Sequence, residues 1–467
     1  MVAHEIPRLA VCGLRGGSGK TLLTLGLISA WRSRGSDVIP FKKGPDYIDA
    51  AWMSLAAGKT CRNLDTFLME KDQALRSFLR SSLPTAVSIL EGNRGLYDGM
   101  DAGGTHSTAE LARLLKCPLL LIIDCTKSTR TLAALVHGCQ TFEENLSLAG
   151  VVLNRIGGPR HEQLVRETIE KATGVPVLGA IPRLQGSRFL ERHLGLVPTA
   201  EHPDADSALE LARKAVESNV DLDSVMEAAR KAPPLEAGDC PPPPERVGES
   251  VRIGVIRDSA FNFYYPENLE RLEKQGAEVV ILDALHDAGL PPLDALYIGG
   301  GFPETHASLL SANRAMRESI RCEGERGLPI YAECGGLTYL CRSILVEGTE
   351  FPMVGLFPLR FEIAPRPQGH GYNIMQVDEA NPFFEVGTTI HGHEFRYSRA
   401  LDYIPGEIKT AYEVLRGKGL DGKRGGLCYK NILAAFCHIH ALGTPQWAEA
   451  MVNRALDFKR ARKNNQT

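Results

Sequence analysis

The feature that most limits how this chain can fold is a repeated alternation of short apolar runs with helical stretches. In the first half the runs read "RLAVCGL", "DVIPFKKG", "AVSILEGN", "PLLLIIDC", "LAGVVLNR" and "VPVLGAIP". In the second half "AEVVILDA", "ALYIGGG" and "LPIYAEC" repeat the pattern. Strands that are apolar on both faces and alternate with helices are typical of parallel sheets covered by helices. We therefore predict an α/β fold in which each sheet is mainly parallel and flanked by helices.

A proline-rich segment divides the two series of strands. It reads "KAPPLEAGDCPPPPERVGES" and is followed by a fresh apolar strand at "VRIGVI". Proline runs neither continue a helix nor sit inside a sheet, and they form stiff, extended spacers. At 467 residues the chain is also too long for one ordinary core. We predict a first domain over residues 1–230, a linker over 231–250 and a second domain over 251–467, rather than a long surface loop in one domain.

Composition excludes several classes of protein. The net charge of −3 favours neither a nucleic-acid partner nor an acidic membrane surface. No run approaches the length of a membrane-spanning helix, and no secretory signal opens the sequence. The eleven cysteines include no C-x-x-C pair, which favours reduced thiols. We expect a cytoplasmic protein whose partners are small molecules, with no nucleic acid and no membrane.

The segment "CGLRGGSGKTLLT" has the context of a phosphate-binding loop, because it runs from a strand through a glycine turn into a helix. Its first glycine, Gly13, stands one place too early for the usual G-x-x-x-x-G-K-[ST] spacing. Backbone N–H groups of such a turn close around phosphate oxygens, Lys20 would neutralise the β- and γ-phosphates, and the Thr21 hydroxyl would ligate Mg²⁺. We predict that ATP binds to Arg15, Gly16, Gly17, Ser18, Gly19, Lys20 and Thr21.

Carboxylates follow other strands of the first domain. Asp46 and Asp49 come just past "FKKG", Glu91 ends an apolar strand, and Asp98 lies in the glycine-rich loop beyond it. Ligands of open α/β sheets gather at the carboxyl ends of strands, and carboxylates are preferred ligands of Mg²⁺. Taken singly, each aspartate could be a helix cap or a turn residue. Together they predict an acidic site beside the phosphate loop.

A second candidate site lies in "LPIYAECGGLTYL", where Cys334 stands between a strand and a helix. A thiol at such a turn is exposed to attack a substrate, and the start of a helix favours its thiolate form. The backbone N–H of Gly335, with those of Gly300 and Gly301 in "YIGGGFPETH", could bind an oxyanion. "AAFCHIHA" offers His438 or His440 as the base. Cysteines interpreted instead as buried apolar residues are Cys12, Cys117, Cys125, Cys139 and Cys437.

These segments resemble a known family. "FKKGPDYID", "EGNRGLYDG", "STAELARLL" and "GVVLNR" are similar to segments of cobyrinic acid a,c-diamide synthases. The phosphate loop resembles that of dethiobiotin synthetase-like enzymes, and the second domain resembles class I-like glutamine amidotransferases. By this resemblance Cys334 is the nucleophile and His438 the base, while His440 stands where the wider class carries a glutamate, so that the third member of the triad is unassigned.

The resemblance also implies roles in the first domain. Asp46, Asp49 and Glu91 would serve the ATP–Mg²⁺ site, with Thr21, Asp46 and Glu91 as Mg²⁺ ligands. Tyr47 and Ile48 would contact the acid substrate, Asp98 would serve the phosphorylated intermediate, and Asn154 would lie near the purine. The implied cofactors are ATP, as co-substrate, and Mg²⁺. Relatives favour a homodimer.

The implied reaction is amidation of the a- and c-acetate carboxylates of a tetrapyrrole such as cobyrinic acid, through an acyl phosphate and ammonia from glutamine. Departures from the family pattern at Arg15, Ala50, Trp52 and Arg94 leave open the same chemistry on sirohydrochlorin, siroheme or nickel-sirohydrochlorin. A partitioning-type ATPase, which shares the "RGGSGKT" loop, is the non-enzyme alternative. It gives no role to "YAECGG" or "FCHIH".

Overall fold

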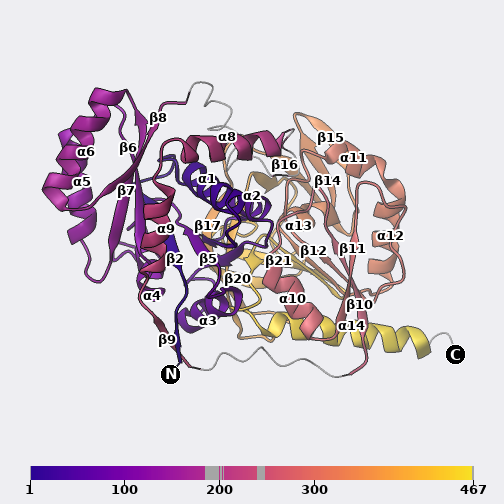
Figure 1. Cartoon of the computed structure of the whole chain (residues 1–467). Helices are drawn as coiled ribbons and strands as arrows, with labels where there is room; N and C mark the ends of the chain where they lie inside the picture. Colours follow the sequence, from indigo (N-terminus) through magenta and orange to yellow (C-terminus); the bar gives the residue numbers. More distant parts are fainter. Residues whose placement is uncertain (1, 185–198, 200–201, 203, 239–247, 465–467) are drawn as a thin grey trace. The chain divides into compact units, whose positions relative to one another are not determined.

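The computed structural model describes residues 2–184, 199, 202, 204–238 and 248–464 (Figure 1). The chain divides into two compact units. The first comprises Met1–Thr66 and Glu70–Pro241, and the second comprises Phe67–Met69 and Pro242–Thr467. Residues 239–247 of the expected linker lie outside the described residues, and the predicted domain limits stay a prediction.

The first unit is built on a seven-stranded sheet in the order β4-β3-β5-β2-β6-β7-β8. Every pair of neighbouring strands in it is parallel, so all carboxyl ends meet at one edge. The strands are β2 (Arg8–Gly13), β3 (Val38–Lys43), β4 (Arg62–Leu64), β5 (Val87–Glu91), β6 (Leu119–Asp124), β7 (Leu148–Ile156) and β8 (Val177–Pro182). A short antiparallel ribbon joins β1 (Val2–His4) to β9 (Leu235–Ala237).

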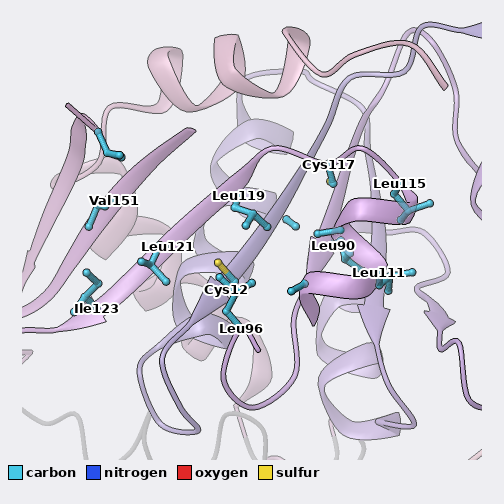
Figure 2. Close-up of a cluster of buried hydrophobic side chains, with 14 of the residues drawn as sticks. Cys12, Leu90, Leu96, Leu111, Leu115, Cys117, Leu119, Leu121, Ile123 and Val151 are labelled. Atoms are coloured by element: carbon cyan, nitrogen blue, oxygen red, sulfur yellow. The ribbon is translucent and has the colours of Figure 1, made fainter. Parts of the chain in front are cut away.

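Helices cover both faces of this sheet because its strands are apolar on both sides. Along β6, Leu119, Leu121 and Ile123 face one buried cluster (Figure 2), whereas Leu120 and Ile122 face another. The first cluster is completed by α3 (Lys71–Ser81), α4 (Thr108–Leu114), α5 (Arg130–Thr141) and α6 (Pro159–Thr173). The second is completed by α1 (Lys20–Ser33), α2 (Tyr47–Ala57), α8 (Ala205–Glu217) and α9 (Leu222–Arg230).

The second unit has a ten-stranded mixed sheet in the order β11-β10-β12-β13-β22-β21-β20-β17-β18-β23. The first five strands pair in parallel and the remaining pairs are antiparallel. The parallel strands are β10 (Val251–Ile256), β11 (Ala277–Leu282), β12 (Ala295–Ile298), β13 (Ile330–Glu333) and β22 (Ile432–Ala435). The antiparallel extension comprises β17 (Gly369–Val377), β18 (Thr389–Arg396), β20 (Thr410–Arg416), β21 (Arg424–Tyr429) and β23 (His438–Ile439).

Helices again flank the sheet of the second unit. One face packs on α11 (Ala307–Ala312), α12 (Arg314–Glu325) and α13 (Gly335–Leu340), and the other on α10 (Pro266–Lys274) and α14 (Gln446–Asn464). A smaller sheet joins β14 (Cys341–Val346), β15 (Thr349–Pro352), β16 (Phe357–Ile363) and β19 (Ser398–Ala400).

The predicted α/β fold of two sheets flanked by helices is confirmed, with a fully parallel sheet in the first unit. The antiparallel extension of the second sheet, however, was not predicted, and this sheet is mixed rather than mainly parallel. The reason is visible in β17, where buried positions alternate with more exposed ones instead of forming a continuous apolar run. Such alternation is typical of an antiparallel sheet with one open face. No helix among the described residues is both long enough and apolar enough to span a membrane.

We expect Leu121→Ala to lower the free energy of unfolding of the first unit by about 2–5 kcal/mol, because it empties a fully buried site at the centre of the sheet. Denaturant unfolding of the purified protein measures the loss. The matched control is Leu135→Ala in α5, whose side chain is 44% exposed and whose loss should stay below about 0.5 kcal/mol. Equal losses in the two variants would contradict the packing described here.

Candidate active sites

The phosphate loop joins β2 to α1 and is shaped by glycines. Gly17 and Gly19 have φ of 73° and 102°, a conformation that side chains with a Cβ disfavour. A Cβ on Gly19 would also lie 2.3 Å from the side-chain nitrogen of Asn154. That amide nitrogen, at the end of β7, donates a hydrogen bond of 2.9 Å to the Ser18 carbonyl. Asn154, expected near the purine, therefore braces the loop in this structure.

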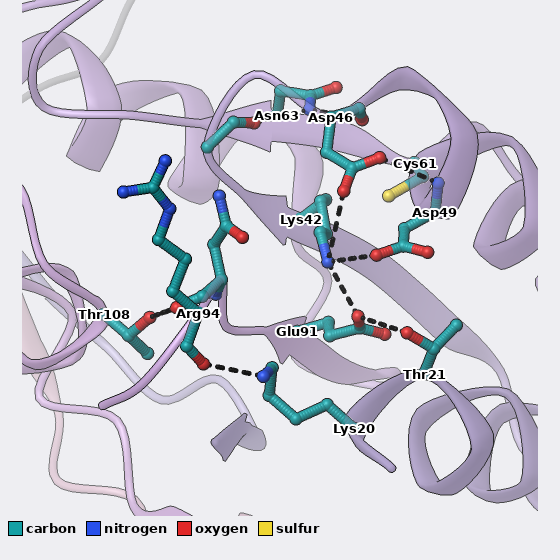
Figure 3. Close-up of polar contacts among 12 residues, drawn as sticks. Lys20, Thr21, Lys42, Asp46, Asp49, Cys61, Asn63, Glu91, Arg94 and Thr108 are labelled. Carbon is teal, nitrogen blue, oxygen red and sulfur yellow. Dashed lines mark hydrogen bonds and ion pairs between the residues drawn. The ribbon is translucent and has the colours of Figure 1, made fainter. Parts of the chain in front are cut away.

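Lys20 begins α1, and its side chain folds back over the loop. Its ammonium donates to the carbonyl oxygen of Arg94 at 2.6 Å (Figure 3) and to that of Arg15 at 3.0 Å. Burial lowers the pKa of Lys20, and the Glu91 carboxylate opposes that effect. The exposed Arg15 guanidinium lies 3.4 Å from an oxygen of Asp124. The loop thus presents two cations.

Beside the loop, the predicted carboxylates converge on a lysine that the sequence did not single out. The buried ammonium of Lys42 lies 2.6 Å from Asp49, 2.7 Å from Glu91 and 3.7 Å from Asp46 (Figure 3). The Thr21 hydroxyl donates to the same Glu91 oxygen at 3.0 Å. We call these five residues the acidic cluster. The structure therefore brings together Thr21, Asp46, Asp49 and Glu91, as expected.

Local structure explains this convergence. Lys42 and Glu91 are paired positions on the parallel strands β3 and β5, so their side chains share a face. Asp46 caps α2 and accepts a hydrogen bond of 2.9 Å from the backbone N–H of Asp49. That cap turns both aspartates toward the end of β3. A strand, a cap and a helix thus position the cluster.

The electrostatics of the acidic cluster are those of one cation among three acids. Burial alone would lower the pKa of Lys42, but Asp49, Glu91 and Asp46 raise it well above its ordinary value. Burial raises the pKa of Glu91, and burial together with Asp49 raises that of Asp46 to about 7. Lys42 lowers the pKa of Asp49 against the effect of burial. Three carboxyl groups thus share one buried ammonium.

These residues fit a bound Mg²⁺. Asp49 Oδ1 and Glu91 Oε2 are buried and make no hydrogen bond to any described residue. Among the described residues no group of three or more His, Cys, Asp or Glu side chains is placed to hold a metal ion, and here the carboxylates face Lys42. Mg²⁺ usually takes only one or two carboxylates and completes its octahedron with water and substrate phosphates. A hydroxyl and free carboxylate oxygens beside a phosphate loop meet that requirement.

Three expected residues of the first unit lie outside this cluster. Asp98 is exposed, and its carboxylate accepts a hydrogen bond of 2.9 Å from the N–H of Gly95. Tyr47 and Ile48 form the first turn of α2 and are partly exposed. Their assignment to the acid substrate and to the phosphorylated intermediate stays a prediction.

In the second unit, Cys334 forms a sharp turn between β13 and α13. Its φ of 48° and ψ of −101° are strained for a residue with a Cβ. Its sulfur lies 3.7 Å from the carbonyl oxygen of Phe395, and its N–H donates to Ala435 at 2.8 Å. Strain of this kind is typical of nucleophile turns at the top of a sheet.

The glycines predicted to bind the oxyanion lie close to this turn and to His438. A Cβ on Gly300 would lie 2.3 Å from Cε1 of His438, and one on Gly335 would lie 2.9 Å from Pro303 and 3.2 Å from the nitrogen of Gly301. Gly301 itself has a φ of 153°. The structure thus brings both glycine loops together with the base.

His438 lies in β23, the short strand that pairs antiparallel with β18. Its ring stacks on that of His393 with centroids 4.8 Å apart, and its Nδ1 lies 3.5 Å from Oε2 of Glu333. Burial would lower the pKa of His438, but interactions with Cys334 and Glu333 raise it to about 10. The imidazole is therefore protonated at neutral pH and can stabilise a thiolate.

Sequence reasoning missed Lys42 and Glu333. Both are charged residues inside otherwise apolar strand segments, "VIPFKK" and "IYAE". Charged side chains are almost never fully buried unless they are paired. A charged residue within an apolar strand segment therefore indicates a buried partner, but only the fold shows which residue that partner is.

Comparison with known protein families places these two sites in one class of protein. Residues 9–197 match the family described as "CobQ/CobB/MinD/ParA nucleotide binding domain". Residues 252–446 match the "CobB/CobQ-like glutamine amidotransferase domain". A nucleotide-binding domain joined to a glutamine amidotransferase domain defines a glutamine-dependent carbon–nitrogen ligase that uses ATP.

Relatives of nearly the same length specify the family. A protein named cobyrinate a,c-diamide synthase from Magnetococcus marinus is 44% identical over 450 residues, which cover 95% of this chain and 96% of the relative. One of the same name from Archaeoglobus fulgidus is 40% identical over 460 residues, covering 98% of this chain and 100% of the relative. This chain belongs to the cobyrinate a,c-diamide synthase family. The partitioning-ATPase alternative is thereby set aside.

We expect Lys42→Met to lower the free energy of unfolding by about 3–5 kcal/mol at pH 8, because it leaves buried carboxylates without a cation. The loss should shrink at pH 6. Without the lysine the folded-state pKa values of these acids lie above their unfolded values, so the folded state takes up protons as the pH falls.

Denaturant unfolding at both pH values measures the effect. Lys59→Met, which breaks a surface pair with Asp37, is the control and should change stability by less than about 1 kcal/mol at either pH. A loss in Lys42→Met that is the same at pH 6 and pH 8 would contradict the electrostatic account.

We expect Gly300→Ala to lower glutamine hydrolysis by about a hundredfold, because the new methyl group displaces His438. Amidation with ammonium chloride in place of glutamine should be retained. Gly248→Ala, where no described atom lies within 4 Å of the added Cβ, is the control. Glutaminase activity unchanged in Gly300→Ala would show that the loop and His438 are not held at this distance during the reaction.

Proposed function

We propose that this chain amidates the a- and c-acetate carboxylates of cobyrinic acid, using glutamine as the nitrogen donor and ATP to activate each carboxylate. The observation that carries the proposal is the similarity to proteins named cobyrinate a,c-diamide synthase, which extends over 95% or more of the chain and so covers both units. The acidic cluster beside Lys20 and the pair of Cys334 with His438 supply the two chemistries that this reaction needs.

In the glutaminase half, the Cys334 thiolate attacks the side-chain amide carbon of glutamine. Backbone N–H groups of Gly335 and the Gly300–Gly301 loop stabilise the oxyanion that forms. The protonated His438 gives its proton to the departing nitrogen, which leaves as ammonia while a thioester remains. His438 then takes a proton from water, which attacks the thioester, releases glutamate and restores the thiolate.

In the synthetase half, a substrate carboxylate oxygen attacks the γ-phosphorus of ATP, forming an acyl phosphate and releasing ADP. Ammonia attacks the acyl carbon, the amide forms, and phosphate leaves with the loss of one proton. Lys20 and the loop N–H groups hold the phosphates in line for transfer. Asp46, Tyr47, Ile48, Asp49, Glu91 and Asp98 would bind the acid substrate and the phosphorylated intermediate, and Asn154 completes the ATP site.

We propose Mg²⁺ as the metal cofactor, held by Thr21, Asp46 and Glu91. When bound, it neutralises phosphate charge during transfer. The unpaired Oε2 of Glu91 supports this assignment. Family resemblance further supports a cytoplasmic homodimer, and the ten described cysteines are all free thiols. Sedimentation analysis of the purified protein tests the dimer.

The decisive experiment offers cobyrinic acid and sirohydrochlorin in parallel, with ATP, Mg²⁺ and glutamine, and counts amidated carboxyl groups by mass spectrometry. We expect two amidations of cobyrinic acid. In Cys334→Ala the rate of amidation should fall at least about a thousandfold with glutamine but be retained with ammonium chloride. In Lys20→Ala amidation should be lost with either nitrogen donor. Amidation of sirohydrochlorin alone would overturn the assigned substrate. Amidation of neither ring would overturn the assigned reaction.

A further inference from the structure

We propose that Glu333, the residue directly before the nucleophile, positions His438 and completes the glutaminase triad. The inference rests on the proposed roles of Cys334 and His438. In the wider class of glutaminases the glutamate follows the histidine by two residues, a place that His440 occupies in this chain. The structure assigns the role to a carboxylate on a different strand.

The contact between the two side chains is direct and shielded from water. Oε2 of Glu333 lies 3.5 Å from Nδ1 of His438, and both side chains are at most 2% exposed. A buried carboxylate retains its charge only where a cation or hydrogen-bond donors face it. Nδ1 of His438 is such a group, which leaves Nε2 for the thiol and the leaving group.

Further hydrogen bonds hold the Glu333 carboxylate in place. The Tyr297 hydroxyl donates to Oε2 at 3.1 Å, and the backbone N–H of Ile439 donates to Oε1 at 3.2 Å. Asn268 in turn binds the carbonyl of Ile439 at 3.0 Å and accepts from the N–H of Ala441 at 2.7 Å. The carboxylate is thus fixed against the strand that carries the base, as expected for a group that orients it.

The turn at Cys334 explains how adjacent residues can both serve one histidine. Successive side chains of a strand point to opposite faces, so Glu333 and Cys334 would diverge if β13 continued. At φ 48° the backbone leaves the strand at Cys334. His438 then interacts with both side chains. The strained turn therefore turns the thiol out of the line of the strand and keeps the carboxylate on the side of the proposed base.

Other charged groups near His438 do not take this role. His393, stacked on it from β18, has a pKa well below its ordinary value because of burial and its histidine neighbours, and is neutral. His440 faces a different carboxylate, with Nε2 at 3.5 Å from Oε2 of Glu267. Arg396 lies on the thiol side, where it interacts with Cys334 and Glu394. Glu333 is thus the carboxylate that faces His438 among the described residues.

The chain offers a matched pair of variants. Glu333→Gln removes the carboxylate facing His438, whereas Glu267→Gln removes another buried carboxylate, which faces His440 at the same 3.5 Å. The experiment measures glutaminase kcat and KM against pH, together with the pH dependence of Cys334 alkylation by iodoacetamide. Amidation with ammonium chloride is measured in the same preparations, and Cys334→Ala is included throughout.

We expect Glu333→Gln to lower glutaminase kcat by at least about a hundredfold with little change in KM. The alkaline limb of the pH profile should move to lower pH. The Glu333 carboxylate raises the pKa of His438, so without this carboxylate the imidazolium loses its proton at a lower pH. Glu267→Gln should keep the wild-type limb and remain within about threefold of wild-type kcat. Ammonium-dependent amidation should be unchanged in both.

The inference would be overturned if the alkaline limb of the Glu333→Gln profile stayed at its wild-type pH. It would also be overturned if the limb of Glu267→Gln moved as far as that of Glu333→Gln. Should Glu333→Gln fail to fold, Tyr297→Phe removes one hydrogen bond to the carboxylate and should give a smaller shift in the same direction. An unmoved limb in that variant would also overturn it. Glutamine-dependent activity that survives in Cys334→Ala would instead refute the proposed function, independently of Glu333.

Discussion

The parallel pairing of β2, β3 and β5 is the constraint on which the first site depends. Because neighbouring strands run in the same direction, their carboxyl ends and the loops that follow lie at one edge of the sheet. Pairing of Lys42 with Glu91 across β3 and β5 then places a cation beside an acid in a buried position. Thr21, in the first turn of α1, donates a hydrogen bond to the same acid. A shift of one residue in this register would separate them.

In the second unit, too, the candidate site lies at the carboxyl end of a parallel strand. β13 ends at Glu333, and the strained turn at Cys334 follows immediately. The proposed base, His438, lies in the antiparallel part of the sheet, where β23 pairs with β18. The mixed topology therefore brings the two proposed catalytic residues together, because Cys334 follows a parallel strand and His438 lies in the antiparallel extension.

Both sites contain a buried charge that faces a residue distant in sequence. Lys42 faces Glu91 on a neighbouring strand as well as the nearby Asp46 and Asp49, and Glu333 faces a histidine more than one hundred positions later. A buried ion pair is weak evidence for stability, since desolvation opposes the attraction between the charges. Such pairs do fix orientation, which is what a phosphoryl-transfer site and a thiol site require.

The sequence by itself determined most of the parallel strands, the glycine–lysine–threonine turn at the start of α1, and the strand-to-helix turn at Cys334, because local backbone requirements and continuous apolar runs specify these features. It also indicated the carboxylates after strand ends. It did not show that the Cys334 side chain is buried in the fold. Only the tertiary structure decided that Lys42 lies among those carboxylates, that Asn154 braces the loop, and that Glu333 faces His438. It also decided the antiparallel extension. The physical reason is that strand register and pairing bring together residues that no local pattern connects.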